Sequence, residues 1–268
     1  NRNTVTALND NQYSLFSRIS WNMDYNSQYP YITQVGKSTG LMYGYLYEGT
    51  YKAQEFNNGT SLKAGIPYLK SISRESLRPG DPKYSDINGD GVIDDNDRTV
   101  IGRGQPIHTG GFSNTFDFYG FDLNIFFQWS YGNDVLNANR LVFESGWKSQ
   151  TNQLASYANR WSPENPTSNI PRVNAVGREE YSSRVIEDGS FLRLKNVSLG
   201  YTLPSRSLRK AGISQMRVYV SADNIWTLTG YSGPDPEVST RNSVLTPGFD
   251  WSAYPRAFGF TAGVNLTF

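Results

Sequence analysis

The chain has 268 residues, no cysteine, one histidine and a net charge of +1, from 25 Lys+Arg and 24 Asp+Glu. We expect no nucleic-acid partner, because the chain has no excess of basic residues to pair with phosphates. The absence of cysteine excludes thiolate metal sites and cysteine nucleophiles, and a single histidine excludes a multi-histidine metal site. Only 18% of the residues are charged and 14% are aromatic. This composition suits a transmembrane β-barrel, whose alternating faces give a hydrophilic average, and equally a secreted β-sandwich.

Apolar and polar residues alternate with a period of two along several segments, which indicates half-buried strands. In chain order, the segments predicted as strands before the C-terminal one are 13–25, around 41–52, 112–118, 121–130, 190–203 and 216–228. Tyr119-Gly120 is the predicted turn of a hairpin. The alternation slips by one near Asn196, which predicts a bulge.

The last strand is the most regular. Its apolar residues are Phe258, Phe260, Ala262, Val264, Leu266 and Phe268, with polar residues or glycine between them. A closed barrel needs an intact last strand, since lipid tolerates no unpaired edge. The segments 53–108 and 133–189 are long and polar, and we expect them on the extracellular rim, with the short Tyr119-Gly120 turn on the periplasmic rim.

One motif has the spacing of an EF-hand-type calcium loop. The expected ligands are Asp86, Asn88 and Asp90 at positions 1, 3 and 5, the carbonyl of Val92 at 7, Asp94 through water at 9, and Asp97 at 12. Position 12 departs from the pattern, because EF-hands carry Glu there. The alternative is a solvated acidic turn whose side chains bond to their own backbone. In both cases the loop would brace a longer segment. The lone His108 and the scattered carboxylates form no catalytic pattern, so we expect no enzyme.

Several motifs together resemble the C-terminal portion of a SusC/RagA-type TonB-dependent outer-membrane transporter. They are residues 80–93 with 97–102, 109–116 leading to 126–134, 189–204, 220–229 with Asp235-Pro236-Glu237, and Tyr254-Pro255 before the last strand. They follow the family's order over most of 36–268, whereas residues 1–35 match only in strand character. Thr261, Gly263, Leu266 and Phe268 also follow the spacing of the outer-membrane assembly signal, although Leu266 stands where an aromatic residue is commoner.

The resemblance implies an all-β fold, a transmembrane antiparallel barrel of 22 strands with long extracellular loops, an N-terminal plug and a TonB box. We expect residues 1–268 to be the C-terminal segment of such a barrel, with a calcium-type insertion at about 81–102 and without the plug, TonB box or signal peptide. At about ten residues per strand, the chain would supply roughly six to eight strands. The expected location is the outer membrane of a Gram-negative cell, crossed many times.

The resemblance also implies active import of a bulky nutrient, a glycan or an oligopeptide. The expected partners are a SusD-like lipoprotein, TonB, the barrel-assembly machinery, the remainder of the chain's own barrel and plug, and the lipid bilayer. Two alternatives stay open: a SusC-like barrel acting as a structural subunit of another outer-membrane assembly, and a secreted calcium-stabilised β-domain that binds glycans.

Overall fold

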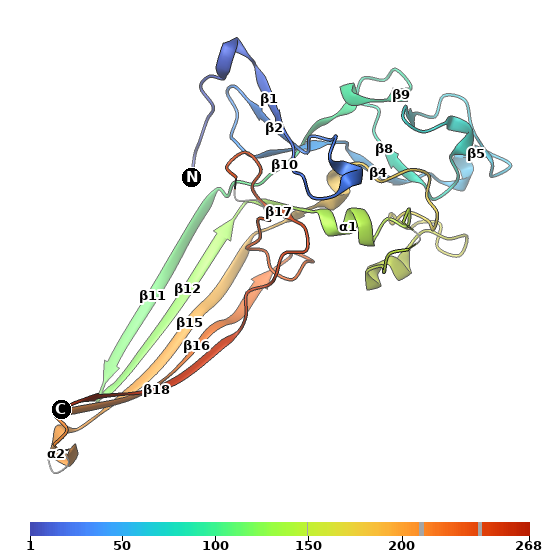
Figure 1. Cartoon of the computed structure of the whole chain (residues 1–268). Coiled ribbons are helices and arrows are strands. Elements are labelled where there is room, and N and C mark those ends of the chain that lie inside the picture. The colour runs from blue at the N-terminus through green and yellow to red at the C-terminus, as the bar shows by residue number, and fades with distance from the viewer. Residues whose placement is uncertain (149, 209–211, 241–242) are drawn as a thin grey trace.

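The computed structural model describes residues 1–148, 150–208, 212–240 and 243–268. They form a long, curved five-stranded sheet with a head of short elements at one end (Figure 1). The C-terminus lies at the end of the sheet far from the head. Among the described helices, none is long and apolar enough to cross a membrane.

The large sheet has the order β11-β12-β15-β16-β18, and all neighbouring strands are antiparallel. Its strands are β11 (His108–Phe118), β12 (Phe121–Tyr131), β15 (Phe191–Leu203), β16 (Gln215–Thr229) and β18 (Gly259–Thr267). Lengths of 9 to 15 residues correspond to roughly 30–50 Å, which lets tilted strands cross the ~25 Å apolar band of an outer membrane. The predicted hairpin, the last strand and the two strands between them are confirmed. The bulge is confirmed as well, because the register of β15 against β16 shifts between Leu194 and Asn196.

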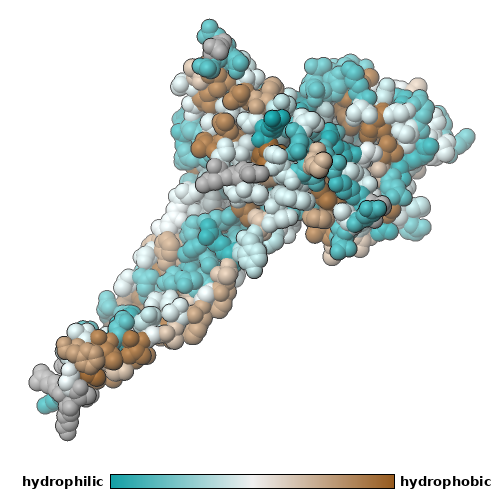
Figure 2. Space-filling view, viewed as in Figure 1, coloured by the Kyte–Doolittle hydropathy of each residue, from teal (hydrophilic) through white to brown (hydrophobic). Residues whose placement is uncertain are grey.

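The register joins the alternating residues of the five strands into two faces of opposite character. The outer face carries Phe112, Phe116, Phe118, Phe121, Leu123, Ile125, Phe127, Trp129, Leu192, Leu194, Val197, Leu199, Tyr201, Met216, Val218, Val220, Trp226, Leu228, Phe260, Val264 and Leu266. The inner face carries Ser113, Thr115, Asp117, Asp122, Asn124, Gln128, Arg193, Asn196, Ser198, Arg217, Ser221, Asp223, Thr261 and Asn265. Phe260, at 67% exposure, and Val264, at 53%, are not part of a water-soluble core. Hydrophobic residues gather at the sheet end near the C-terminus, whereas much of the visible head is hydrophilic (Figure 2).

The head contains several small sheets. One has the order β1-β2-β3-β10, from Ser14–Ser17, Tyr31–Gln34, Leu41–Gly44 and Thr99–Arg103. Another has the order β14-β13-β17, from Ile186–Asp188, Asp134–Asn137 and Phe249–Asp250. Pairs of strands join β4 (Tyr47–Thr50) to β8 (Pro82–Tyr84), β5 (Phe56–Asn57) to β6 (Ser61–Leu62), and β7 (Tyr68–Leu69) to β9 (Val92–Ile93).

The described helices are short. They are α1 (Ala138–Phe143), α2 (Ser205–Leu208) and 3-10 turns at Asn9–Asn11, Met23–Tyr25, Ala53–Glu55, Arg74–Ser76, Asp95–Asp97, Ala155–Asn159 and Ser183–Val185. The polar segments 53–108 and 133–189 therefore hold many short elements that pack together in the head. Its largest apolar cluster includes Tyr25, Met42, Leu136 and Phe249.

The predicted strand at 13–25 is wrong beyond Ser17. Its later apolar residues turn into the head: the Trp21 ring stacks on Tyr25 at 5.0 Å, and Trp21 Nε1 donates to the Tyr181 hydroxyl at 2.7 Å. A continuous strand would send these side chains outward instead. Tyr25 is fully buried, so packing within the head decides the local structure.

The predicted strand around 41–52 is interrupted between Gly44 and Tyr47. Tyr45 leaves the β3 pairing, donates its N–H to the carbonyl of Tyr181 at 2.9 Å, and packs its ring 5.4 Å from that of Tyr84. Because this segment and 13–25 both join the head, the described residues supply five long strands to the large sheet, fewer than the expected six to eight.

Candidate functional site

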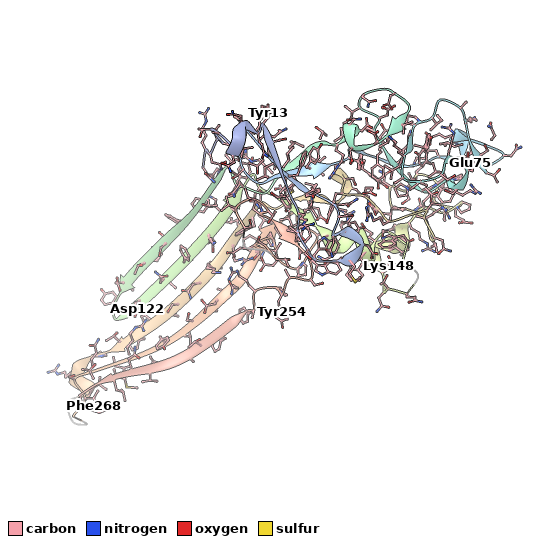
Figure 3. The ribbon with its side chains drawn as sticks, turned by 45° about the horizontal axis from the view of Figure 1, so that its top comes forward. Tyr13, Glu75, Asp122, Lys148, Tyr254 and Phe268 are labelled. Carbon is pink, nitrogen blue, oxygen red and sulfur yellow. The ribbon has the colours of Figure 1, made fainter. Side chains whose placement is uncertain are left out.

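The inner face contains an ion pair that spans three strands. Asp122 of β12 and Arg217 of β16 lie on either side of β15, and the Arg217 Nε to Asp122 Oδ1 distance is 2.9 Å. Gly200 of β15 lies between them, where a Cβ atom would stand 2.4 Å from the guanidinium and 2.5 Å from the carboxylate. The missing side chain therefore lets the pair close across β15. Asp122 lies far from the head, whereas Lys148 and Glu75 lie within it (Figure 3).

Neutral polar residues of the inner face are also bonded across strands. The Asn196 amide donates to Ser221 at 3.0 Å and to Asp223 at 2.8 Å. The Asn124 amide donates to Thr115 at 3.0 Å. Such cross-strand bonds satisfy the polar groups and leave a surface that suits water and polar solutes.

Arg193 fixes the connection between β16 and β18, residues 230–258, to the inner face. Its side chain is 2% exposed, and its guanidinium lies 2.6 Å from Asp235 Oδ1 and 3.0 Å from Glu237 Oε2. Arg193 Nε also donates to the Thr227 hydroxyl at 2.9 Å. Glu237 in turn pairs with Arg256 at 2.8 Å. A buried cation held by two carboxylates ties this connection to strand β15.

A cavity of about 740 Å³ lies where the inner face meets this connection. Its lining combines the rings of Phe126 and Phe191, the amide of Gln128, and the Glu237–Arg256 pair. Aromatic faces with a few polar groups are typical of sites that hold a ligand by stacking and hydrogen bonds. The arrangement is suited to contacting a polar solute on the inner face of the sheet.

The predicted calcium loop is folded around its own side chains. The Asp86 carboxylate accepts from the N–H groups of Gly89 at 2.7 Å and Gly91 at 2.8 Å. The Asp97 carboxylate is fully buried and accepts from the N–H groups of Ile87 and Asp94, both at 2.8 Å. Gly91 has φ of +85°, which fits the sharp turn at position 6.

The other oxygens follow the same local pattern. Asn88 Oδ1 accepts from Asp90 N at 2.9 Å, and Asp90 Oδ1 accepts from Val92 N at 2.9 Å. The pKa of Asp94 lies below its usual range. The main cause is the hydrogen bond that its carboxylate accepts from the N–H of Asn96, and the second is the hydrogen bond from the Lys70 ammonium. The structure thus brings the predicted residues into one loop, and the backbone bonds of the alternative acidic turn are present too.

The donor set of this loop fits a hard cation. In the described ranges, no three histidine or acidic side chains are grouped so as to hold a metal by themselves. An EF-hand-type loop also uses an amide and a backbone carbonyl, here Asn88 and Val92. Asp86, Asp90 and Asp97 take part in none of the ion pairs that the described residues form, so their charge is not neutralised by a side chain.

The sequence and the fold both have named relatives. The chain is 38% identical to TonB-dependent receptor P3 of Formosa agariphila over 242 residues, which are 88% of this chain and 23% of the relative. It is 25% identical to TonB-dependent receptor SusC of Bacteroides thetaiotaomicron over 263 residues, 93% of this chain and 24% of the relative. A search of family models found no match.

Among solved structures, the RagAB peptide transporter matches with a TM-score of 0.69 at 22% identity, over 97% of this chain and 25% of that chain. The RagAB peptide importer in the closed-closed state matches with a TM-score of 0.65 at 24% identity, over 89% of this chain and 24% of that chain. The chain is homologous to TonB-dependent receptors of the SusC/RagA type. It spans about a quarter of the length of the relatives that it matches.

The SusC/RagA fold gives the two faces their environments, since one face of a barrel wall meets lipid and the other meets the interior. Of the predicted assembly-signal residues, Thr261, Gly263 and Leu266 lie in β18, and Phe268 directly follows it. β18 pairs with β16 along one edge and has no strand partner on its other edge among the described residues. The signal itself stays a prediction.

The charged pairs of the large sheet follow no pattern in the sequence. Arg193 and Asp235 are 42 positions apart, and no spacing rule connects them. One signal was present: Arg193 stands between two leucines of an otherwise alternating strand. A charge at such a position predicts a partner on the inner side of the barrel.

Proposed function

We propose that this chain is the C-terminal barrel segment of an outer-membrane active importer for a bulky nutrient, a glycan or an oligopeptide. The observation that carries the proposal is the two-faced sheet, with an apolar outer face and a bonded polar inner face. A water-soluble glycan-binding domain would leave that outer face in water, so the sheet argues against a secreted protein.

The importer would act as the SusC-like barrel of a SusCD-type complex. A SusD-like lipoprotein would cover the extracellular side, where the head lies, and TonB would supply the energy from the inner membrane. The RagAB relatives, named as peptide importers, support a large solute. The remainder of the barrel and plug would complete the pore, and the barrel-assembly machinery would capture β18 by pairing with its free edge.

We also propose that calcium braces the head through the loop from Asp86 to Asp97. Asp86, Asn88, Asp90 and Asp97 would supply side-chain oxygens, Val92 a carbonyl, and Asp94 a contact through water. When bound, the ion would supply positive charge that offsets the unpaired carboxylates. The chain's own residues already hold the turn, so calcium would rigidify this loop and would not take part in transport.

Import is tested on the full-length receptor in its native cells. Deleting its gene should abolish uptake of one nutrient class, and deleting the TonB box alone should abolish uptake while leaving the barrel in the membrane. A lipoprotein should co-purify with the receptor. A receptor that has neither a lipoprotein partner nor TonB-dependent uptake would contradict the proposal and favour a structural subunit.

Calcium is tested by the metal content of the purified receptor. Asp86→Ala should lose the ion, whereas Asp95→Ala should keep it, because Asp95 is adjacent to the loop ligands but points into solvent. Equal calcium in both variants would reject the proposed ligands.

A further inference from the structure

A groove opens on the outer face at the end of the sheet nearest the head. It runs over the ends of β11, β12, β15 and β16 and has a volume of about 580 Å³. By register, Trp129, Leu192 and Leu228 occupy one row of the outer face here. The groove is therefore continuous with the surface that meets lipid, and we call it the rim groove.

The lining of the rim groove combines small residues with large apolar and aromatic ones. Ser190 and Gly230 lie one step beyond Leu192 and Leu228 on the same face. The His108 and Tyr131 rings stack at 5.2 Å on one side, and Trp129 Nε1 donates to His108 Nδ1 at 3.1 Å. These bonds hold the aromatic side in place, so the depression is a built feature of the sheet.

The chemistry of the rim groove is that of a hydrocarbon site. Its lining contains no Lys, Arg, Asp or Glu, and Leu228 remains 58% exposed. Four other cavities of the described residues each include a charged side chain. A peptide or an anionic solute would find no ion partner in the rim groove. His108 and Tyr131 lie at its head-side end, where a polar headgroup would begin.

We propose that the rim groove binds an acyl chain of one membrane lipid in the leaflet beside the head, which is the outer leaflet in the proposed orientation. Its position on the lipid side and its uncharged lining favour a lipid chain over a protein segment. The inference depends on the outer face meeting lipid and not on transport. The bound lipid would cover Leu192 and Leu228 and fix the receptor's depth in the membrane.

Gly230→Phe is the direct test. A Cβ at Gly230 would meet no atom within 4 Å, and φ there is not in the left-handed region, so a side chain can be introduced at this position of the groove lining. Ala262→Phe is the matched control, because it adds the same ring to the outer face in β18, away from the groove. Leu228→Asn removes one side of the groove and serves as a second variant if Gly230→Phe does not fold.

The full-length receptor would be purified from its native outer membrane and analysed by native mass spectrometry. We expect a lipid adduct on the parent receptor and on Ala262→Phe, and an occupancy lower by about tenfold or more in Gly230→Phe and Leu228→Asn. Equal occupancy in all four proteins would overturn the proposal. So would loss of a bound protein from Gly230→Phe while the lipid adduct stays unchanged. A parent receptor that keeps the lipid adduct but shows no TonB-dependent uptake would reject the import function and leave the rim groove standing.

Discussion

Replacing Arg193 with methionine tests whether one buried cation holds the 230–258 connection on the inner face. Arg193 is 2% exposed and Asp235 is 5% exposed, so both charges lie out of water. Removing one partner of a buried ion pair leaves an uncompensated charge and costs about 3–5 kcal/mol. Asp235 bears most of this cost, because Glu237 keeps its contact with Arg256 at 2.8 Å.

The cost should appear locally, since the connection can detach while the sheet stays paired. A penalty of 3–5 kcal/mol corresponds to roughly 10²- to 5 × 10³-fold faster amide hydrogen exchange in the described part of residues 230–256. Arg217→Met is the control. Arg217 and Asp122 are 27% and 31% exposed, and such a pair contributes about 0–1 kcal/mol. In Arg217→Met, the amide hydrogen exchange rates should therefore change by less than about fivefold.

The double variant Arg193→Met, Asp235→Asn isolates the charge from the packing. Removing the stranded carboxylate should restore much of the protection of 230–256, because no unpaired charge remains buried. If Arg193→Met and Arg217→Met changed exchange equally, or if the double variant exchanged as fast as the single one, burial of Arg193 and Asp235 would not be what holds the connection in place.

Three further variants test other parts of the structure. Gly200→Val should push apart the ion pair across β15 and lower stability by about 1 kcal/mol, measured by the shift in the denaturant midpoint of the full-length receptor. Burial raises the pKa of Glu144, but the Ser156 hydroxyl and two arginines outweigh it and hold that pKa below its usual value. Its stabilising contribution is therefore present at neutral pH and lost as the pH falls below about 4.5, and Glu144→Gln should flatten this acid-side loss of hydrogen-exchange protection in the head. Chelation of calcium should speed exchange across residues 86–97 in the parent receptor and change nothing in Asp86→Ala, and an equal response in both would count against the loop as the calcium site.

The long strands could be predicted because two-residue periodicity is a local property. One apolar row runs along each of the segments from Phe112 to Trp129 and from Phe258 to Phe268. Such a segment forms a strand wherever one of its two faces meets an apolar environment. The bulge at Asn196 was visible for the same reason, since a slip in phase is a slip in register. The acidic loop of residues 86–97 could be located because its residues are close in sequence, and calcium binding there stays a prediction.

The head and the charged pairs could not be predicted because they depend on contacts between distant segments. Residues 13–25 also alternate, although less regularly than β18, yet Tyr25 is buried by residues near 180, and periodicity does not say which surface covers a strand. Arg193 illustrates the same limit. Its environment is set by a connection that folds back onto β15, which only the three-dimensional path of the chain reveals.

The choice of aromatic residue separates the two environments more sharply than the alternation does. Tyr25, Tyr31 and Tyr51 are buried in the head, and each hydroxyl donates to a backbone carbonyl at 2.7 to 2.9 Å. Hydrocarbon offers a phenol no such partner, so phenylalanine suits the middle of a lipid-facing strand. The tyrosine-rich alternation of 41–47 entered the head, and the phenylalanine-rich alternation of 112–127 became the outer face. An alternating segment rich in tyrosine therefore indicates a surface that must also find hydrogen-bond acceptors, which lipid cannot supply.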